Sequence, residues 1–504
     1  MLKSIQLSYC SLLVSLIFRQ TEISGMITNQ VVDKDSMANF QVHVIDKSDP
    51  IDSVVVSYKK SYMFNTFDRY SLNIVLKPNH SGNFQFSLPI TSGAGKITQL
   101  QIFTGKEYLI SKEYLIETED RINLTICKKG DQLTLNFSGK GSDKYTCRRN
   151  IELTYDKLRE GYFRYNANTR MTDFKFMDSI SNAWKLETTK IINQNKKRIG
   201  ILAYQVMQAD AQNQVPLRRE QFYRIAFNKS KKPEEREKIR QHYLSSPQKP
   251  ITFSDQTYTL SYQYLQDLIR QVQTYLYLSH NGSQYSIAEV YKYIDVKYQG
   301  VLKERLLMQL LINPMFGGIE MEEHTEDYEN CLQKALLISK STQVRYEISK
   351  KLSSIKKGLN VYNFSLLDQN GNFVRLEDFR GKVILLDIWF TGCTACKQFS
   401  EKMQKEITPV LKENDSFVVV SISTDKNKAV WLKSLSQNTY TTNDHINLYT
   451  NGLGADHPLL LYYEARSFPF LLLIDKDGKL FSRFNASINA KDLIKLVQSA
   501  IASD

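Results

Sequence analysis

The sequence predicts a multi-domain α+β chain with an N-terminal β-sandwich, a helical middle region and a C-terminal α/β domain. Three observations support this fold class: short alternating apolar runs early in the chain, helical apolar spacing in the middle, and a continuous apolar strand followed by a helix near the end. The 504 residues exceed one ordinary domain, and a hydrophobic content of 42% supplies several cores. The expected parts are residues 1–25, a signal peptide or short N-terminal anchor; 26–147, the sandwich; 148–357, a mainly helical domain or connector; and 358–504, the α/β domain.

The first 18 residues are typical of a targeting segment. Lys3 supplies a positive start, and a mostly apolar stretch follows from Ile5 to Phe18. The stretch is too short for a convincing stable membrane anchor, and it has no clean small-x-small cleavage site. Cys10 matches a lipobox cysteine poorly, since Tyr9 stands where a small residue is expected. We expect export to the periplasm or cell envelope; the alternative is a buried N-terminal strand or helix of a cytosolic protein.

Short alternating runs separated by turns predict an antiparallel β-sandwich between about residues 27 and 145. The five runs are Phe40–Ile45, Ser53–Ser57, Leu72–Leu76, Phe84–Leu88 and Leu133–Phe137. Cys127 and Cys147 flank the last of these strands and could form a structural disulfide, although the sequence alone does not fix the pairing.

Residues from about 150 to 357 are predicted to be mainly helical. The stretches Leu265–Leu276 and Val301–Ile312 follow the i, i+3, i+4, i+7 rule, and Asn313-Pro314 ends the second. The stretch Lys340–Lys357 is the expected final helix and hinge into the C-terminal domain. The many tyrosines of this region are more typical of packing than of a ligand site.

The net charge of +13 is spread over residues of both signs. In Lys229–Arg240, for example, basic and acidic residues are interleaved, which is typical of a solvated helix or loop. Because no nucleic-acid motif accompanies the charge, we expect no nucleic-acid partner. An envelope lipid surface is the more reasonable partner of a basic exported protein, so membrane association is expected.

A Cys-x-x-Cys pair at the junction of a strand and a helix is the clearest chemical signal in the chain. The apolar strand Val383–Ile388 precedes Cys393 and Cys396, and the apolar spacing of Lys397–Lys412 predicts a helix after them. Unpaired N–H groups at a helix N-terminus favour a thiolate, and they can lower a thiol pKa from about 8.5 to roughly 3.5–7.5. We therefore expect Cys393 to attack as the nucleophile and Cys396 to resolve the mixed disulfide.

Asp387 is a carboxylate in the middle of this apolar strand, six positions before Cys393. A buried carboxylate needs a reason. With a raised pKa it could accept the proton of Cys396 as that thiol attacks, which is general base catalysis in an apolar site. The alternative is a structural aspartate bonded to nearby backbone N–H groups.

Other uses of a Cys-x-x-Cys pair fit the residues less well. A c-type haem site needs His where Lys397 stands, and a structural zinc site needs a second ligand pair, which the sequence lacks. A peroxiredoxin-type thiol peroxidase needs a Pro-x-x-x-Thr-x-x-Cys pattern, and Phe390 occupies its threonine place. A peroxide-reducing redoxin remains the second enzymatic interpretation.

The C-terminal 150 or so residues resemble the TlpA/ResA-like thiol-disulfide oxidoreductases of the thioredoxin superfamily, in the Bacteroidetes type with an N-terminal β-domain and a helical connector. The resemblance rests on the stretches Phe364–Gly371, Leu376–Trp389 and Ser467–Lys479. It implies a thioredoxin fold in which the Cys393–Cys396 disulfide is itself the redox centre, with no other cofactor and no metal.

The same resemblance implies roles for the loop before the late strand. Pro469 opens that strand and is the expected cis-proline, because proline brings the cis bond within easy energetic reach and a strand start tolerates its missing N–H. Phe468 is then expected to offer its backbone to an extended substrate, as an added strand would pair. Together with Phe468, Trp389 and Gly392 are the expected substrate-binding residues.

Three departures from the family pattern limit what can be carried over. Thioredoxin has Trp before the first cysteine and Gly-Pro between the two, whereas Gly392 and Thr394-Ala395 stand here. The reduction potential of thioredoxin therefore does not carry over to the Cys393–Cys396 pair. Phe399 occupies the place where many ResA-like proteins carry an acidic residue, which argues against a specialty in cytochrome maturation.

The sequence thus predicts a thiol-disulfide oxidoreductase of the cell envelope with protein thiol or disulfide clients and an upstream redox partner. The opposing hypothesis is an envelope binding or scaffold protein whose C-terminal domain is a passive module. The presence of both cysteines, Asp387 and Pro469 favours the enzyme, because a passive domain has no physical need for all four. The clients and the direction of electron flow are not set by the sequence.

Overall fold

The computed structural model describes residues 37–45, 51, 53–59, 71–90, 94–104, 107–111, 113–129, 132–166, 174–213, 219–245, 250–312, 326–412, 414–463, 465 and 467–503. The predicted targeting segment, residues 1–25, lies outside these. Contacts divide the chain into two compact units, Met1–Phe222 with Phe253–Tyr264 and Tyr223–Thr252 with Leu265–Asp504. The domain boundaries expected from the sequence remain predictions.

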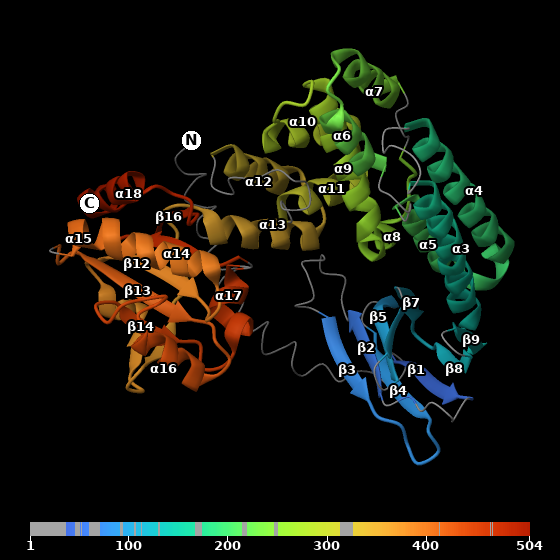
Figure 1. The fold of residues 1–504 in the computed structure, drawn as a ribbon, viewed down its shortest axis with the longest axis horizontal. Helices are drawn as coiled ribbons and strands as arrows, with labels where there is room; N and C mark the ends of the chain where they lie inside the picture. The colour runs from blue at the N-terminus through green and yellow to red at the C-terminus, as the bar shows by residue number, and fades with distance from the viewer. Residues whose placement is uncertain are drawn as a thin grey trace. The chain divides into compact units, whose positions relative to one another are not determined.

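The N-terminal unit begins with a sandwich of two sheets (Figure 1). The four-stranded sheet has the order β4-β1-β8-β9, and the five-stranded sheet has the order β3-β2-β5-β6 with β7 paired to β5. The strands are β1 Met37–Val44, β2 Ser53–Lys59, β3 Ser71–Leu76, β4 Phe84–Pro89, β5 Ala94–Thr104, β6 Glu107–Ser111, β7 Tyr114–Glu117, β8 Arg121–Lys129 and β9 Gln132–Lys140. Alternate apolar side chains of both sheets, such as Phe40 and Val56, meet in one core.

Two expectations for this region need correction. The five predicted strands correspond to β1 to β4 and β9, and the four strands β5 to β8 were missed. The sandwich is also not purely antiparallel, because β1 and β8 pair in parallel from Asn39↔Arg121 to Val44↔Ile126. Cys127 and Cys147 are free thiols, so the optional structural disulfide is not formed.

The middle region is helical, as predicted. Its described helices are α3 Ser142–Asn166, α4 Phe174–Ile199, α5 Ile201–Asn213, α6 Arg219–Lys229, α7 Pro233–Ser245, α8 Asp255–Leu260, α9 Tyr262–Ser279, α10 Ile287–Lys297, α11 Gly300–Ile312, α12 Glu326–Ile338 and α13 Thr342–Ile355. Helices α9, α11 and α13 correspond to the three predicted ones. None of the helices in the described part of the chain is long and apolar enough to cross a membrane.

The C-terminal domain is built on a mixed sheet with helices packed against it (Figure 1). The sheet has seven strands in the order β11-β10-β14-β13-β12-β15-β16. The strands are β10 Ser365–Asp368, β11 Phe373–Arg375, β12 Val383–Trp389, β13 Phe417–Ser423, β14 Ile446–Tyr449, β15 Phe470–Ile474 and β16 Leu480–Phe484. Every residue of β12 is buried, which explains why its sequence is nearly continuous in Val, Ile and Leu.

Two layers of helices cover this sheet. Helix α14 Thr394–Lys402 and helix α18 Ala490–Ala502 pack on the face that holds Val383 and Leu385. Helix α17 Pro458–Tyr462 packs on the opposite face, with Ile384 and Leu386. The predicted helix 397–412 is therefore three segments: α14, a π-helical turn Met403–Ile407, and α15 Thr408–Leu411. The predicted three-part α+β fold class is confirmed.

Candidate active site

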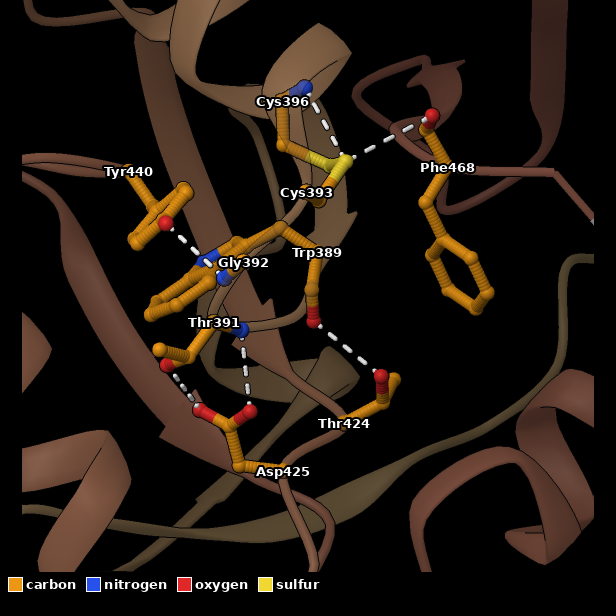
Figure 2. The surroundings of a disulfide bond; sticks show 9 residues. All are labelled: Trp389, Thr391, Gly392, Cys393, Cys396, Thr424, Asp425, Tyr440 and Phe468. Carbon is orange, nitrogen blue, oxygen red and sulfur yellow. Dashed lines mark hydrogen bonds between the residues drawn. A yellow bond between two sulfur atoms is a disulfide. The ribbon is translucent and has the colours of Figure 1, made fainter.

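The two cysteines form a disulfide between a strand end and a helix start (Figure 2). Strand β12 ends at Trp389, and Cys393 is the N-cap residue of α14, with a Cα–Cα distance of 5.3 Å to Cys396. The backbone N–H of Cys396 donates a hydrogen bond to Cys393 Sγ at 3.1 Å. An amide donor and the positive end of the helix dipole therefore act on the same sulfur, and both favour its thiolate once the disulfide is reduced.

The loop before β15 faces this sulfur. The peptide bond between Phe468 and Pro469 is cis, and it is the only cis bond among the described residues. The carbonyl oxygen of Phe468 lies 3.7 Å from Cys393 Sγ (Figure 2). The rings of Phe468 and Phe390 meet edge to face with 5.4 Å between centroids, and Phe390 is 38% exposed. A backbone carbonyl and an accessible aromatic ring thus lie next to the nucleophile.

Asp387 lies on the face of the sheet that α14 covers. Successive side chains of a strand alternate between faces, so Asp387 shares a face with Leu385, which packs against α14 residues such as Phe399. Its neighbours across the sheet are Ser421 on β13 and Leu471 on β15. The carboxyl group is therefore enclosed by the core beneath the helix that carries Cys396.

The carboxyl group of Asp387 is buried without full compensation. Only 5% of the residue is exposed, and its Oδ1 has no hydrogen-bond partner among the described residues. Burial raises the pKa of Asp387 from 3.8 to about 8, because the ionised form loses its hydration. The structural alternative, a carboxylate bonded to backbone N–H groups, does not hold for this oxygen.

Trp389 and Gly392, the other predicted substrate-binding residues, have different surroundings. Trp389 is fully buried in a cluster with both cysteines, and its Nε1 donates a 2.7 Å hydrogen bond to Ser421 Oγ. Its side chain has no surface for a client in this disulfide form, so the assignment remains a prediction. Gly392 is exposed and has a φ of +98°, a conformation that L side chains rarely adopt. This conformation favours glycine at the position.

Two residues near the disulfide were missed in the sequence. Asp425 accepts hydrogen bonds from the N–H and hydroxyl of Thr391, and Tyr440 accepts one from the N–H of Gly392 (Figure 2). The carboxyl ends of parallel strands meet at one sheet edge, so a polar residue just after β13 was a usable signal for Asp425. Tyr440 lies in the loop after α16 Lys428–Ser436, where no local pattern distinguishes it.

Phe399, the departure from the ResA-like acidic position, is 1% exposed. It belongs to the core between β12 and α18. An acidic side chain at this place would be buried among apolar groups. The described residues contain no group of three or more His, Cys, Asp or Glu that could hold a metal ion.

Comparison with known proteins places the similarity in the C-terminal domain. A family model described as thioredoxin-like matches residues 381–480. The thioredoxin-like protein YneN of Bacillus subtilis is 31% identical over 134 residues, which are 26% of this chain and 72% of that protein. The thiol-disulfide oxidoreductase ResA of the same species is 26% identical over 127 residues, which are 25% of this chain and 66% of that protein.

One solved structure is also similar to part of this chain. The thioredoxin domain of a thiol-disulfide oxidoreductase from Bacteroides vulgatus is 26% identical, covers 29% of this chain and 99% of its own, and has a TM-score of 0.25.

Proposed function

Through its C-terminal domain the chain belongs to the thioredoxin-like family, and we propose that this domain is a thiol-disulfide oxidoreductase for protein disulfides of the cell envelope. The membership confirms the resemblance found in the sequence. The observation that carries the proposed activity is the Cys393–Cys396 disulfide at the start of α14, with the Cys396 amide directed at Cys393 Sγ.

The reductive reaction proceeds in two exchanges. The Cys393 thiolate attacks one sulfur of a client disulfide, so that a Cys393–client bond forms and the client S–S bond breaks. The second client sulfur leaves as a thiolate and takes a proton from water. Cys396 then attacks Cys393 Sγ, which re-forms the Cys393–Cys396 disulfide and releases the first client sulfur. The client gains two electrons and the chain loses two, which a dithiol reductant must return.

Asp387 supplies the proton transfer that the second exchange needs. Cys396 is 1% exposed, so water cannot readily take its proton. A carboxyl group with a pKa of about 8 is ionised in a minor fraction of molecules at neutral pH. That fraction is a strong enough base to accept the thiol proton inside the core, where a carboxylate of ordinary pKa would be a weaker one.

Clients are proposed to bind along the loop at Phe468. An extended protein segment next to a disulfide can use the Phe468 backbone as a neighbouring strand, and the exposed ring of Phe390 offers apolar contact beside the reacting sulfur. Protein disulfides therefore suit this site better than small polar disulfides.

The envelope location rests on the sequence of residues 1–18 and its targeting pattern. An oxidising compartment would supply the disulfide clients, and a reductase there needs an upstream redox partner instead of the glutathione pool. Membrane association through basic side chains remains part of this proposal. Protease treatment of spheroplasts before and after lysis tests the location. Degradation before lysis is expected, and protection until the spheroplasts are lysed would contradict it.

Reduction of insulin by dithiothreitol tests the activity. The wild-type chain should accelerate the reduction, Cys393→Ser should abolish the acceleration, and Cys396→Ser should accumulate mixed disulfides with insulin on non-reducing gels. Absence of acceleration by the wild type with any protein disulfide would contradict the enzyme and favour the scaffold hypothesis. Turnover of peroxide in place of insulin would favour the redoxin.

A further inference from the structure

We propose that Tyr440 and Asp425 are positioning residues, which hold the loop before Cys393 and so keep its sulfur against the Cys396 amide. The inference rests on the proposed function only in naming Cys393 as the nucleophile. Both residues act through the backbone of the two residues that precede Cys393.

The amides of the loop are fixed one after the other. Thr391 N–H donates to Asp425 Oδ1 at 2.9 Å, and Gly392 N–H donates to the Tyr440 hydroxyl at 2.8 Å. Cys393 N–H donates to Phe390 O at 3.2 Å, which closes the turn. Two of these three acceptors come from outside the loop, from different elements of the domain.

The loop needs such anchors because Gly392 gives it freedom. At its φ of +98° nothing lies within 4 Å of the place where a Cβ would stand. Side-chain packing therefore does not hold this residue, and glycine has access to more backbone conformations than any other residue. The hydrogen bond from its N–H to the Tyr440 hydroxyl restricts it.

Both anchors are themselves rigidly held. The ring of Tyr440 stacks on Trp389 with 5.0 Å between centroids and 14° between planes, and Trp389 is fully buried. Asp425 also accepts the hydroxyls of Thr391 at 2.7 Å and Ser423 at 3.0 Å. A tyrosine fixed by stacking and a carboxylate fixed by several donors can each hold the loop N–H group that they bind in one place.

The consequence lies in the charge state of Cys393. Its sulfur is the N-cap acceptor of α14, so the stabilisation of its thiolate depends on where the loop places it. If the loop moves, the thiolate loses contact with the Cys396 N–H and its pKa rises. One net hydrogen bond corresponds to about a 2- to 10-fold change in the thiolate equilibrium.

The test compares two tyrosine-to-phenylalanine variants of the full reduced chain. Tyr440→Phe removes the hydroxyl that accepts Gly392 N–H and keeps the stacked ring. Tyr463→Phe is the matched control, because its hydroxyl accepts the N–H of Tyr362 at 2.9 Å in the core on the α17 side of the sheet. Iodoacetamide alkylation of Cys393 is followed from pH 5 to 10 by mass spectrometry of its peptide.

For Tyr440→Phe we expect the midpoint of the alkylation pH profile to move to higher pH. The alkylation rate at pH 7 should be about 2- to 10-fold lower than that of the wild type, and the rates should be equal at high pH. Tyr463→Phe should follow the wild type throughout. An unchanged profile in Tyr440→Phe, an equal displacement in Tyr463→Phe, or a loss that persists at high pH would each overturn the proposal for Tyr440.

Asp425 is tested with Asp425→Ala, which removes the acceptor of the Thr391 N–H. Loss of a nearby negative charge by itself would lower the pKa of the Cys393 thiol, so a shift of the alkylation profile to higher pH supports the positioning role of Asp425. An unchanged profile or a shift to lower pH overturns it. Alkylation needs no client, so these results stand apart from insulin reduction, whose absence in the wild type would contradict only the proposed function.

Discussion

Two aspartates, one in each unit of the chain, are equally buried but have opposite surroundings. Asp120, between β7 and β8, is 3% exposed, and Asp387 on β12 is 5% exposed. Asp120 Oδ1 lies 2.5 Å from the ammonium of Lys144, and its Oδ2 accepts the Tyr145 hydroxyl at 2.8 Å and the Glu117 N–H at 3.0 Å. Oδ1 of Asp387 has no such partner among the described residues.

A buried carboxylate has a structural or a chemical role depending on whether its charge has a partner. The charge of Asp120 is matched by a buried lysine on α3, so the group joins the sandwich to its first helix. Gly141 leaves room for this pair, because a Cβ there would lie 2.1 Å from Asp120 Oδ1. The charge of Asp387 is unmatched, and its pKa rises to about 8. A group in that state can exchange a proton near neutral pH.

The largest expected effect is a pH-dependent stability difference at Asp387. Its folded pKa lies above the unfolded value of 3.8, so its contribution to stability is complete below about pH 3.8 and is lost as pH rises to about 8. Asp387→Asn keeps the side-chain volume but has no titrating carboxyl group, so its stability does not fall for this reason over the same range. The free energy of unfolding of the variant, relative to that of the wild type, should therefore rise by up to about 5 kcal/mol between pH 4 and 8.

Urea unfolding read by pulse proteolysis and mass spectrometry measures this difference on peptides of β12 and β15. The comparison at pH 5.5 and 8.5 is decisive. If wild type and Asp387→Asn lose stability in parallel over this range, Asp387 is compensated in the same way as Asp120, and the contrast between the two aspartates disappears.

The second effect is the loss of a partnered charge. Asp120→Ala leaves Lys144 buried, with Glu117 at 3.1 Å as its remaining partner. Removal of one member of a buried pair costs about 3 kcal/mol or more. The same unfolding measurement should show this loss on peptides of β8 and α3, with no change in those of β12. A much smaller loss would show that water or another group replaces the carboxylate.

The smallest effect is expected at the adjacent exposed pair, which serves as the control. Glu119 and Lys140 form a salt bridge with side chains 62% and 64% exposed. The hydrogen bond from Lys140 lowers the pKa of Glu119, but solvent screens such surface pairs and they add little to stability. Glu119→Gln should therefore unfold at the same urea concentration as the wild type. A loss as large as that of Asp120→Ala would mean that burial does not set the difference.

The sequence predicted most of what positions the disulfide. The apolar run of β12, the cysteine spacing and the proline before β15 are local patterns, and each fixes an element without reference to a distant one. Strand β8 was missed although Ile122, Leu124 and Ile126 alternate in it, so its signal was present. Its parallel pairing with β1 could not be read, because the choice of partner depends on long-range packing.

The candidate site shows the same limit. Cys393, Cys396 and Asp387 carry their chemistry in their residue types and spacing. The hydroxyl of Tyr440 binds the N–H of Gly392, which lies more than 40 positions earlier in the chain. The sequence contains 29 tyrosines, and no local pattern distinguishes this one. Positioning contacts of this kind require the structure.

The rate at which Cys396 resolves the mixed disulfide reports directly on proton transfer to Asp387. Mixed disulfides with a client are followed on non-reducing gels in single turnovers of wild type and Asp387→Asn, with Cys396→Ser as the variant that cannot resolve. The wild-type rate should rise with pH toward a midpoint near 8. Asp387→Asn should resolve about 100-fold more slowly at pH 7 and recover as the Cys396 thiol ionises unaided, with unchanged attack by Cys393. Equal resolving rates of wild type and Asp387→Asn across roughly pH 6 to 8 would contradict the proton transfer by Asp387.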